Sequence, residues 1–224
     1  MRLPWIVVKA LIAATLFASG PSMANSPRTS DDLRAAATRG DVARLKEAIA
    51  AGAPLDARDG EGRTPLLAAV AAGQTAAALA LIEAGADINA QAANKDTPWL
   101  LAGALGRTEM LRAMVPKGPD LSIRNRFGGN ALIPACERGH VETIELLLTT
   151  KIDVDHVNNL GWTCLLEIVI LGDGGPRHVA ATRLVLTAGA NPNIADRDGV
   201  TPLDHARRRG QTEVAGLIAA AGGR

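Results

Sequence analysis

A short pattern returns at a fixed spacing along this chain of 224 residues and restricts the folds that it can adopt. The pattern starts with a polar cap residue, often Thr-Pro, and continues with small and aliphatic residues up to a glycine nine positions later. The starts are Thr64, Thr97, Asn130, Thr163 and Thr201, so three steps of 33 residues are followed by one of 38. A constant period of this length is typical of a solenoid, in which each unit packs mainly against its two neighbours.

Each start predicts a short helix. A threonine oxygen can accept a hydrogen bond from a free backbone N–H of the first turn, and proline has the φ angle that a helix needs. A glycine with positive φ can end the helix, and the candidates are Gly73, Gly106, Gly139, Gly172 and Gly210. Apolar residues at three- and four-residue steps then predict a second helix in each unit. Its end lies 12 residues before the next start, at Gly52, Gly85, Gly118, Lys151 and Gly189.

This organisation resembles the ankyrin repeat. The resemblance rests on Thr64-Pro65-Leu66 and the alanines after it, on Gly73, and on the segment Gly85-Ala86-Asp87-Ile88-Asn89. It implies an all-α ankyrin-repeat solenoid of about six helix-turn-helix units, with projecting β-hairpin loops and a concave groove between the loops and the first helices. The tetratricopeptide repeat has a similar period but needs bulky aromatic residues, which are only 2% of this chain. After a polar lead at 25–30, the expected units are 31–63, 64–96, 97–129, 130–162, 163–200 and 201–222.

Five residues depart from the pattern of the other units. Lys95 replaces the glycine that stands two residues before the other starts. Asn130 replaces threonine as a cap, and Pro134 predicts a loose start of its helix because proline has no N–H to donate. Asn125 and Asn158 stand where the family usually has aspartate.

Unit 163–200 contains five extra residues. The spacings on either side of them are unchanged, so the extra residues must lie between Gly172 and the end of the second helix. We expect an enlarged inter-helix loop at residues 173–178.

The first two dozen residues have the features of a secretory signal peptide. Arg2 and Lys9 flank a short apolar run, and small residues precede a predicted cleavage after Ala24. The alternative is an uncleaved membrane anchor, although the apolar run is short for spanning a bilayer. The signal and the alanine-rich composition predict a periplasmic or secreted bacterial protein.

Charge and composition restrict the partners that we expect. Removal of residues 1–24 leaves 22 basic and 23 acidic residues, a net charge of −1. Near-neutrality argues against nucleic acid as a partner, and we expect no membrane contact after cleavage. The expected state is a monomer that binds another protein of unknown identity.

The two cysteines, Cys136 and Cys164, allow one disulfide in an oxidising compartment. Cys136 lies six residues after its start and Cys164 only one after its own, which predicts an axial offset of about 7 Å between them. With neighbouring helices roughly 8 to 10 Å apart, we expect the two sulfur atoms not to meet.

The sequence offers little that could carry out chemistry. The four histidines fall in three units and lack the i, i+4 spacing or companion cysteines of a zinc site. Phosphate-binding loops and nucleophile motifs are absent from the sequence. We therefore expect a non-enzymatic protein with neither a metal nor a cofactor.

Two neighbouring hairpins are the strongest candidates for partner binding. Residues 124–130 and 157–162 combine asparagine, arginine and an aromatic residue each, and tryptophan and arginine dominate binding hot spots. The predicted partner-binding residues are Trp99, Arg124, Arg126, Phe127, Asn130, Asn158, Asn159, Trp162 and Glu167. The competing explanation is that Phe127 and Trp162 simply pack one hairpin against the other and that Glu167 pairs with an arginine.

An alternative function is that of a small-ligand binder or minor hydrolase centred on the enlarged loop. Its residues would be Glu137, Glu167, Asp173, Arg177 and His178. A pocket that encloses Glu167 with a raised carboxyl pKa would favour this alternative, whereas an open groove with solvated side chains would favour protein binding.

Overall fold

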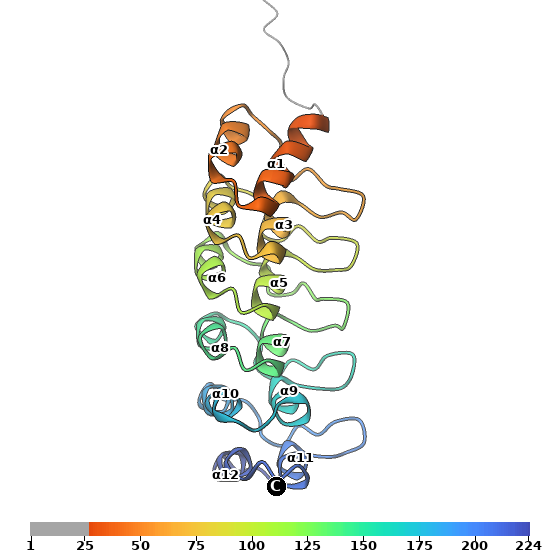
Figure 1. Ribbon diagram of the computed structural model, residues 1–224. Coiled ribbons are helices and arrows are strands. Elements are labelled where there is room, and N and C mark those ends of the chain that lie inside the picture. The colour runs from red at the N-terminus through yellow and green to blue at the C-terminus, as the bar shows by residue number, and fades with distance from the viewer. Residues whose placement is uncertain (1–26) are drawn as a thin grey trace, which may run out of the picture.

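The computed structural model describes residues 27–224, and these form pairs of antiparallel helices stacked in one column (Figure 1). The inner helices are α1 (Pro27–Arg39), α3 (Pro65–Ala72), α5 (Pro98–Ala104), α7 (Leu132–Glu137), α9 (Cys164–Leu171) and α11 (Pro202–Arg208). The outer helices are α2 (Val42–Ala50), α4 (Thr75–Glu83), α6 (Thr108–Met114), α8 (Val141–Leu148), α10 (Pro176–Thr187) and α12 (Thr212–Ala220). A short 3₁₀ helix, η1 (Val115–Lys117), extends α6. The all-helical solenoid predicted from the period is confirmed.

The loops between units project from the inner helices, on the side away from the outer helices (Figure 1). They have the shape of hairpins, but within residues 27–224 they contain no β-strand. The predicted signal peptide lies outside the described residues. Helix α1 begins at Pro27, inside the segment expected to be a polar lead.

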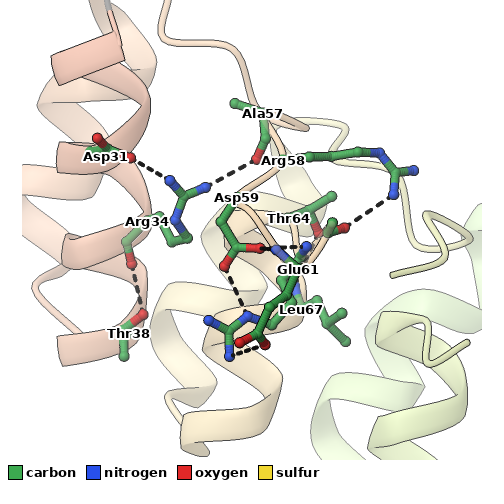
Figure 2. Close-up of polar contacts among 11 residues, drawn as sticks. Asp31, Arg34, Thr38, Ala57, Arg58, Asp59, Glu61, Thr64 and Leu67 are labelled. Atoms are coloured by element: carbon green, nitrogen blue, oxygen red, sulfur yellow. Dashed lines mark hydrogen bonds and ion pairs between the residues drawn. The ribbon is translucent and has the colours of Figure 1, made fainter. Parts of the chain in front are cut away.

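Threonine caps begin the inner helices as predicted. Thr64 Oγ1 accepts a hydrogen bond from Leu67 N at 3.2 Å (Figure 2), and Thr97, Thr163 and Thr201 make the equivalent bond. In unit 130–162, Asn130 accepts from the N–H groups of the second and third residues after it, and α7 begins one residue later than its counterparts. The late start follows from Pro134, which has no N–H for the first turn.

Four of the five hairpins are closed by one polar side chain at the first turn, and in the other hairpin Ala92 occupies that position. Asp59 N donates to Arg63 O at 3.1 Å, and Asp59 Oδ1 accepts from the N–H groups of Glu61 and Arg63, each at 2.9 Å (Figure 2). Arg34 of α1 donates to Ala57 O at 3.4 Å and so ties the first helix to this hairpin. The closing side chain recurs in three later hairpins as Asn125, Asn158 and Asp196.

The five extra residues of unit 163–200 are divided between a loop and a helix. Four residues separate α9 from α10, whereas two separate α3 from α4, and α10 has 12 residues where α4 has nine. The expectation of one enlarged loop at 173–178 is therefore wrong in part, because Pro176 begins α10. The glycine with positive φ is also displaced: Gly174 has a φ of 68°, whereas Gly172 has a φ of −71°.

Successive inner helices contact one another in a constant register. The second residue after each start is a large apolar side chain in the core, at positions 66, 99, 132, 165 and 203. At two successive steps, the sixth residue after one start lies against the first residue after the next start. At Gly103, an added Cβ would come within 2.9 Å of the Ala131 side chain.

The same register joins Cys136 to Cys164, and the expectation that these sulfur atoms do not meet is wrong. The two residues form a disulfide with their Cα atoms 5.5 Å apart. The error came from assuming that equivalent residues of neighbouring helices lie at the same height. Because the sixth residue after Asn130 faces the first residue after Thr163, the expected axial offset between the cysteines disappears. The disulfide therefore links α7 directly to α9.

We predict that reduction of this disulfide lowers the free energy of unfolding by about 3 to 4 kcal/mol, because the reduced unfolded chain regains the freedom of a loop of 28 residues. Denaturant unfolding with and without dithiothreitol measures the change. A Cys136→Ala/Cys164→Ala variant is the control and should not respond to the reductant. An equal response of both proteins would contradict the prediction.

A second prediction concerns Lys95, an exposed residue with a φ of 65° at the position where four other hairpins have glycine. A left-handed backbone conformation costs a residue with a side chain about 1 to 2 kcal/mol of folding free energy. Glycine avoids this strain, but its unfolded state is more flexible, so that part of the gain in stability is lost. We expect Lys95→Gly to raise the free energy of unfolding by about 0.5 to 1 kcal/mol in denaturant titrations. Lys95→Ala keeps the strain, so an equal gain in both variants would rule out this explanation.

Candidate functional site

The hairpins of units 97–129 and 130–162 lie side by side, as predicted, because their backbones are bonded to each other. Asn159 N donates to Phe127 O at 2.8 Å, and His156 Nε2 lies 2.6 Å from Gly128 O. The hairpin tips therefore stand at a fixed distance above the inner helices α7 and α9.

Asn158 connects its hairpin to helix α9. Its Oδ1 accepts from the N–H groups of Leu160 at 2.9 Å and Trp162 at 3.0 Å. Its side-chain nitrogen is then free to donate to Glu167 Oε1 at 2.9 Å. Both residues are buried, and only 4% of Glu167 is exposed.

The next unit has a different pair at the same two positions. There Asp196 closes the hairpin, and its Oδ2 lies 2.7 Å from His205 Nε2. An aspartate at position 158 would instead place a second carboxylate against Glu167, which would be repulsive at this distance. The departure from aspartate at position 158 is thus explained by the glutamate that it contacts.

A cavity of about 280 Å³ opens beside Glu167, between the two hairpin tips and the helices α7 and α9. We call it the 4/5 cavity, after the fourth and fifth units. Its lining consists of Asn125, Phe127, Gly129, Ile133, Pro134, Glu137, Arg138, Asn158, Leu160, Glu167 and Leu171.

The rim of the 4/5 cavity is apolar and exposed. Among the described residues four large hydrophobic side chains are exposed, and three of them line this cavity: Phe127 at 50%, Leu160 at 48% and Leu171 at 50%. They come from two hairpin tips and from the end of α9. An apolar rim around a small polar interior is the usual composition of a binding site.

The interior of the cavity is acidic. Burial, and then the nearby carboxylate of Glu137, raise the pKa of Glu167 to about 7, against the opposing effect of the Asn158 hydrogen bond. Glu167 therefore exchanges its proton near neutral pH. Arg138 also lines the cavity, but its Nη1 donates to Ala104 O at 2.9 Å and so faces the preceding unit.

This arrangement provides a proton-exchanging carboxyl group but few other reactive groups. The cavity lining contains no serine, threonine, cysteine, lysine or histidine. Across residues 27–224, no group of three or more His, Cys, Asp or Glu side chains is placed to hold a metal ion. The pocket and the raised pKa of Glu167 are the features expected for the small-ligand alternative, and the ionisable side chains in the lining are Glu137, Arg138 and Glu167.

Four of the predicted partner-binding residues lie at the hairpin tips. Arg126 and Phe127 are exposed, with the guanidinium 4.7 Å from the ring centroid, and Arg126 Nη1 lies 3.8 Å from Asp96 Oδ2. Asn159 is exposed too. Arg124 is half-buried, and its guanidinium donates to backbone oxygens of its own loop, including Ile123 O at 3.1 Å.

Three other predicted residues are not available as surface anchors. Trp99 is only 2% exposed, because it occupies the core position that leucine fills in the other units. Asn130 is 3% exposed, and its side chain caps α7 through its oxygen and donates to Asp153 O through its nitrogen. Trp162 is half-buried against the core, so packing explains it at least in part.

The five residues of the alternative ligand site do not line one cavity. Glu137 and Glu167 line the 4/5 cavity, whereas Arg177 lines a separate cavity beside His140. His178 is buried, with Nδ1 2.7 Å from Asp173 Oδ1 and Nε2 3.0 Å from Glu137 O. Its ring therefore ties the enlarged connection to the preceding unit.

Sequence analysis missed several residues of the cavity, although the period contained a signal for them. Leu160 lies one period after Phe127, at a tip position where the other hairpins have Glu61, Asn94 and Asp198. Two successive apolar residues at a position that is otherwise polar could have been noticed. The missed residues are Asn125, Gly129, Ile133, Pro134, Arg138, Leu160 and Leu171.

Glu167 should make stability depend on pH. Its pKa is higher in the folded protein than in the unfolded chain, so the folded state binds more protons between about pH 4.5 and 7 and loses stability as the pH rises through this range. We predict that Glu167→Gln melts at a higher temperature than the native protein at pH 8 and at nearly the same temperature at pH 5. Parallel melting curves across pH would contradict this.

Models of the ankyrin repeat family match two parts of the chain. A model for three copies of the repeat matches residues 99–196, and a model for many copies matches residues 33–82. Ankyrin repeats serve as scaffolds for protein interaction, generally without enzymatic activity. Among curated proteins, the ankyrin repeat protein YahD of Escherichia coli K12 is 50% identical over 98 residues, which are 43% of this chain and 49% of YahD. The match thus spans about half the length of that relative.

Solved structures of ankyrin repeat domains superpose on most of the chain. A domain from Acinetobacter baumannii AYE has a TM-score of 0.82 and 49% identity, with 86% of this chain and 98% of that one covered. The ankyrin repeat domain of Bcl-3, a member of the IkappaB protein family, has a TM-score of 0.74 and 26% identity, with 86% of each chain covered. The chain belongs to the ankyrin repeat family.

Proposed function

We propose that this protein is a non-enzymatic scaffold in the bacterial periplasm that binds a partner protein through the hairpin tips and concave groove of units three to five. The observation that carries the proposal is the 4/5 cavity, where three exposed apolar side chains surround a buried polar interior. Grouped apolar exposure of this kind marks interaction surfaces.

The neighbourhood of the cavity supports protein binding further. Phe127 is covered on one face by the Arg126 guanidinium, and aromatic and arginine side chains are enriched where binding energy concentrates. The two hairpins at the cavity are hydrogen-bonded to each other, so ordering them on binding costs little conformational entropy.

Two observations support the periplasmic location. The first residues have the features of a secretory signal, and the Cys136–Cys164 disulfide suits an oxidising compartment. No helix within residues 27–224 is both long and apolar enough to cross a membrane.

A small-molecule ligand is the second candidate function, favoured by the buried carboxyl in the same cavity. The cavity, at about 280 Å³, is at the lower end of the range for small-molecule sites. Its exposed rim side chains extend over two hairpin tips and a helix end, which fits a larger partner better.

A pair of substitutions in one hairpin tests the proposal. Leu160 and Val157 are exposed to similar degrees, but only Leu160 lines the cavity. We predict that Leu160→Ala weakens capture of the partner from a periplasmic extract at least about tenfold, and that Val157→Ala changes it less than about twofold. Trp162 is a poorer probe because its core contacts make loss of stability an alternative explanation.

Thermal melting of both variants provides the control, since neither exposed side chain contributes much to the core. Capture that is unaffected by Leu160→Ala, or lost equally in both variants, would show that the 4/5 cavity is not the binding site.

A further inference from the structure

We infer that the 4/5 cavity receives one basic side chain of the partner, a lysine or an arginine, with apolar partner residues on either side of it. This inference rests on the proposed function and specifies the chemistry of the partner segment. It is argued from the charge, the hydrogen bonding and the rim of the cavity.

Two carboxyl groups from neighbouring units line the cavity. Glu137 comes from α7 and Glu167 from α9, and the disulfide beside them fixes the distance between these helices. Their proximity is itself evident in the electrostatics, because Glu137 contributes to the raised pKa of Glu167. A cation between them would relieve this repulsion.

One oxygen of Glu167 lacks a partner. Oε1 accepts from Asn158, while no described residue donates a hydrogen bond to Oε2. Oε2 is not among the buried polar atoms without a partner, so a donor placed in the cavity that Glu167 lines can reach it. The ammonium or guanidinium of a partner would supply that donor.

The cations near the site are turned to other groups. Arg138 donates to Ala104 O, and Arg126 pairs with Asp96 and covers Phe127. Histidine and lysine are absent from the lining. The charge of the two carboxyl groups is thus left for a ligand to neutralise.

The rim accounts for the apolar part of the partner segment. Lysine and arginine bury their aliphatic stems along apolar surfaces while the charged end reaches a polar site. Phe127, Leu160 and Leu171 surround the entrance, so they can contact both the stem and the residues next to it.

Proton linkage distinguishes a cationic ligand from an anionic one. A cation beside Glu167 favours the ionised carboxylate and therefore lowers its pKa, whereas a ligand carboxylate favours the protonated form and raises it. The groups facing Glu167 are Glu137 from α7 and the neutral Asn158 from the hairpin, with Arg138 on the same lining.

The experiment uses three acetylated and amidated peptides of sequence Ala-Ala-Leu-X-Leu-Ala-Ala, in which X is lysine, norleucine or glutamate. NMR titration of the Asn158 side-chain amide at pH 7.5 measures affinity, and ¹³C NMR of the glutamate carboxyl groups measures the pKa of Glu167 with each peptide. We expect the lysine peptide to bind at least about tenfold more tightly than the norleucine peptide and to lower that pKa.

Three variants complete the test. Glu167→Gln and Glu137→Gln should each weaken the lysine peptide several-fold and leave the norleucine peptide nearly unchanged. Glu145→Gln, which removes an exposed acid from the outer helix α8 of the same unit, should have no effect. Glu137 is only half-buried, so its variant tests the charge of the cavity at a second position with fewer packing contacts.

The outcomes separate this inference from the proposed function. Equal binding of the lysine and norleucine peptides, or a pKa of Glu167 that rises on binding the lysine peptide, would overturn the inference. If Leu160→Ala still abolished partner capture in that case, the cavity would remain the protein-binding site with a different occupant.

Discussion

The contact between the sixth residue after one unit start and the first residue after the next start determines the rest of this structure. At Gly103 and Ala131 the contact is so close that a side chain on the glycine would collide with its neighbour. At Cys136 and Cys164 the same contact becomes a covalent bond. Where this register recurs the hairpins stand side by side, and two pairs of neighbouring tips are joined by backbone hydrogen bonds, Ala93 N to Glu61 O and Asn159 N to Phe127 O.

The regular repeat accommodates a local site where a hairpin residue and the inner-helix residue that it contacts both differ from those of the next unit. Asp196 and His205 form a polar pair between a hairpin and an inner helix, and one unit earlier the same positions hold Asn158 and Glu167. The oxygen of the Asn158 amide accepts hydrogen bonds from the hairpin, and its nitrogen donates one to the Glu167 carboxyl. The carboxyl is thereby held in an acidic cavity under an apolar rim, which is the basis for both functional proposals.

The sequence predicted the fold well because the period identifies equivalent residues. It predicted the site less well because equivalence alone does not reveal the axial register between neighbouring helices or the direction of a side chain. The register decides that the cysteines meet. Trp99 was expected at the surface, yet it shares its position with Leu66 and Leu132 in the core. Glu167 was predicted as a site residue, but its hydrogen bond with Asn158 depends on side-chain directions that the period does not specify.

The register of α7 against α9 can be tested directly by mapping the cysteines of the purified protein after incubation with oxidised glutathione. The protein is denatured, alkylated without reduction, digested and analysed by mass spectrometry. The account predicts one intramolecular cross-linked peptide pair containing Cys136 and Cys164. Alkylation of both cysteines, or disulfides between separate chains in place of that pair, would contradict it.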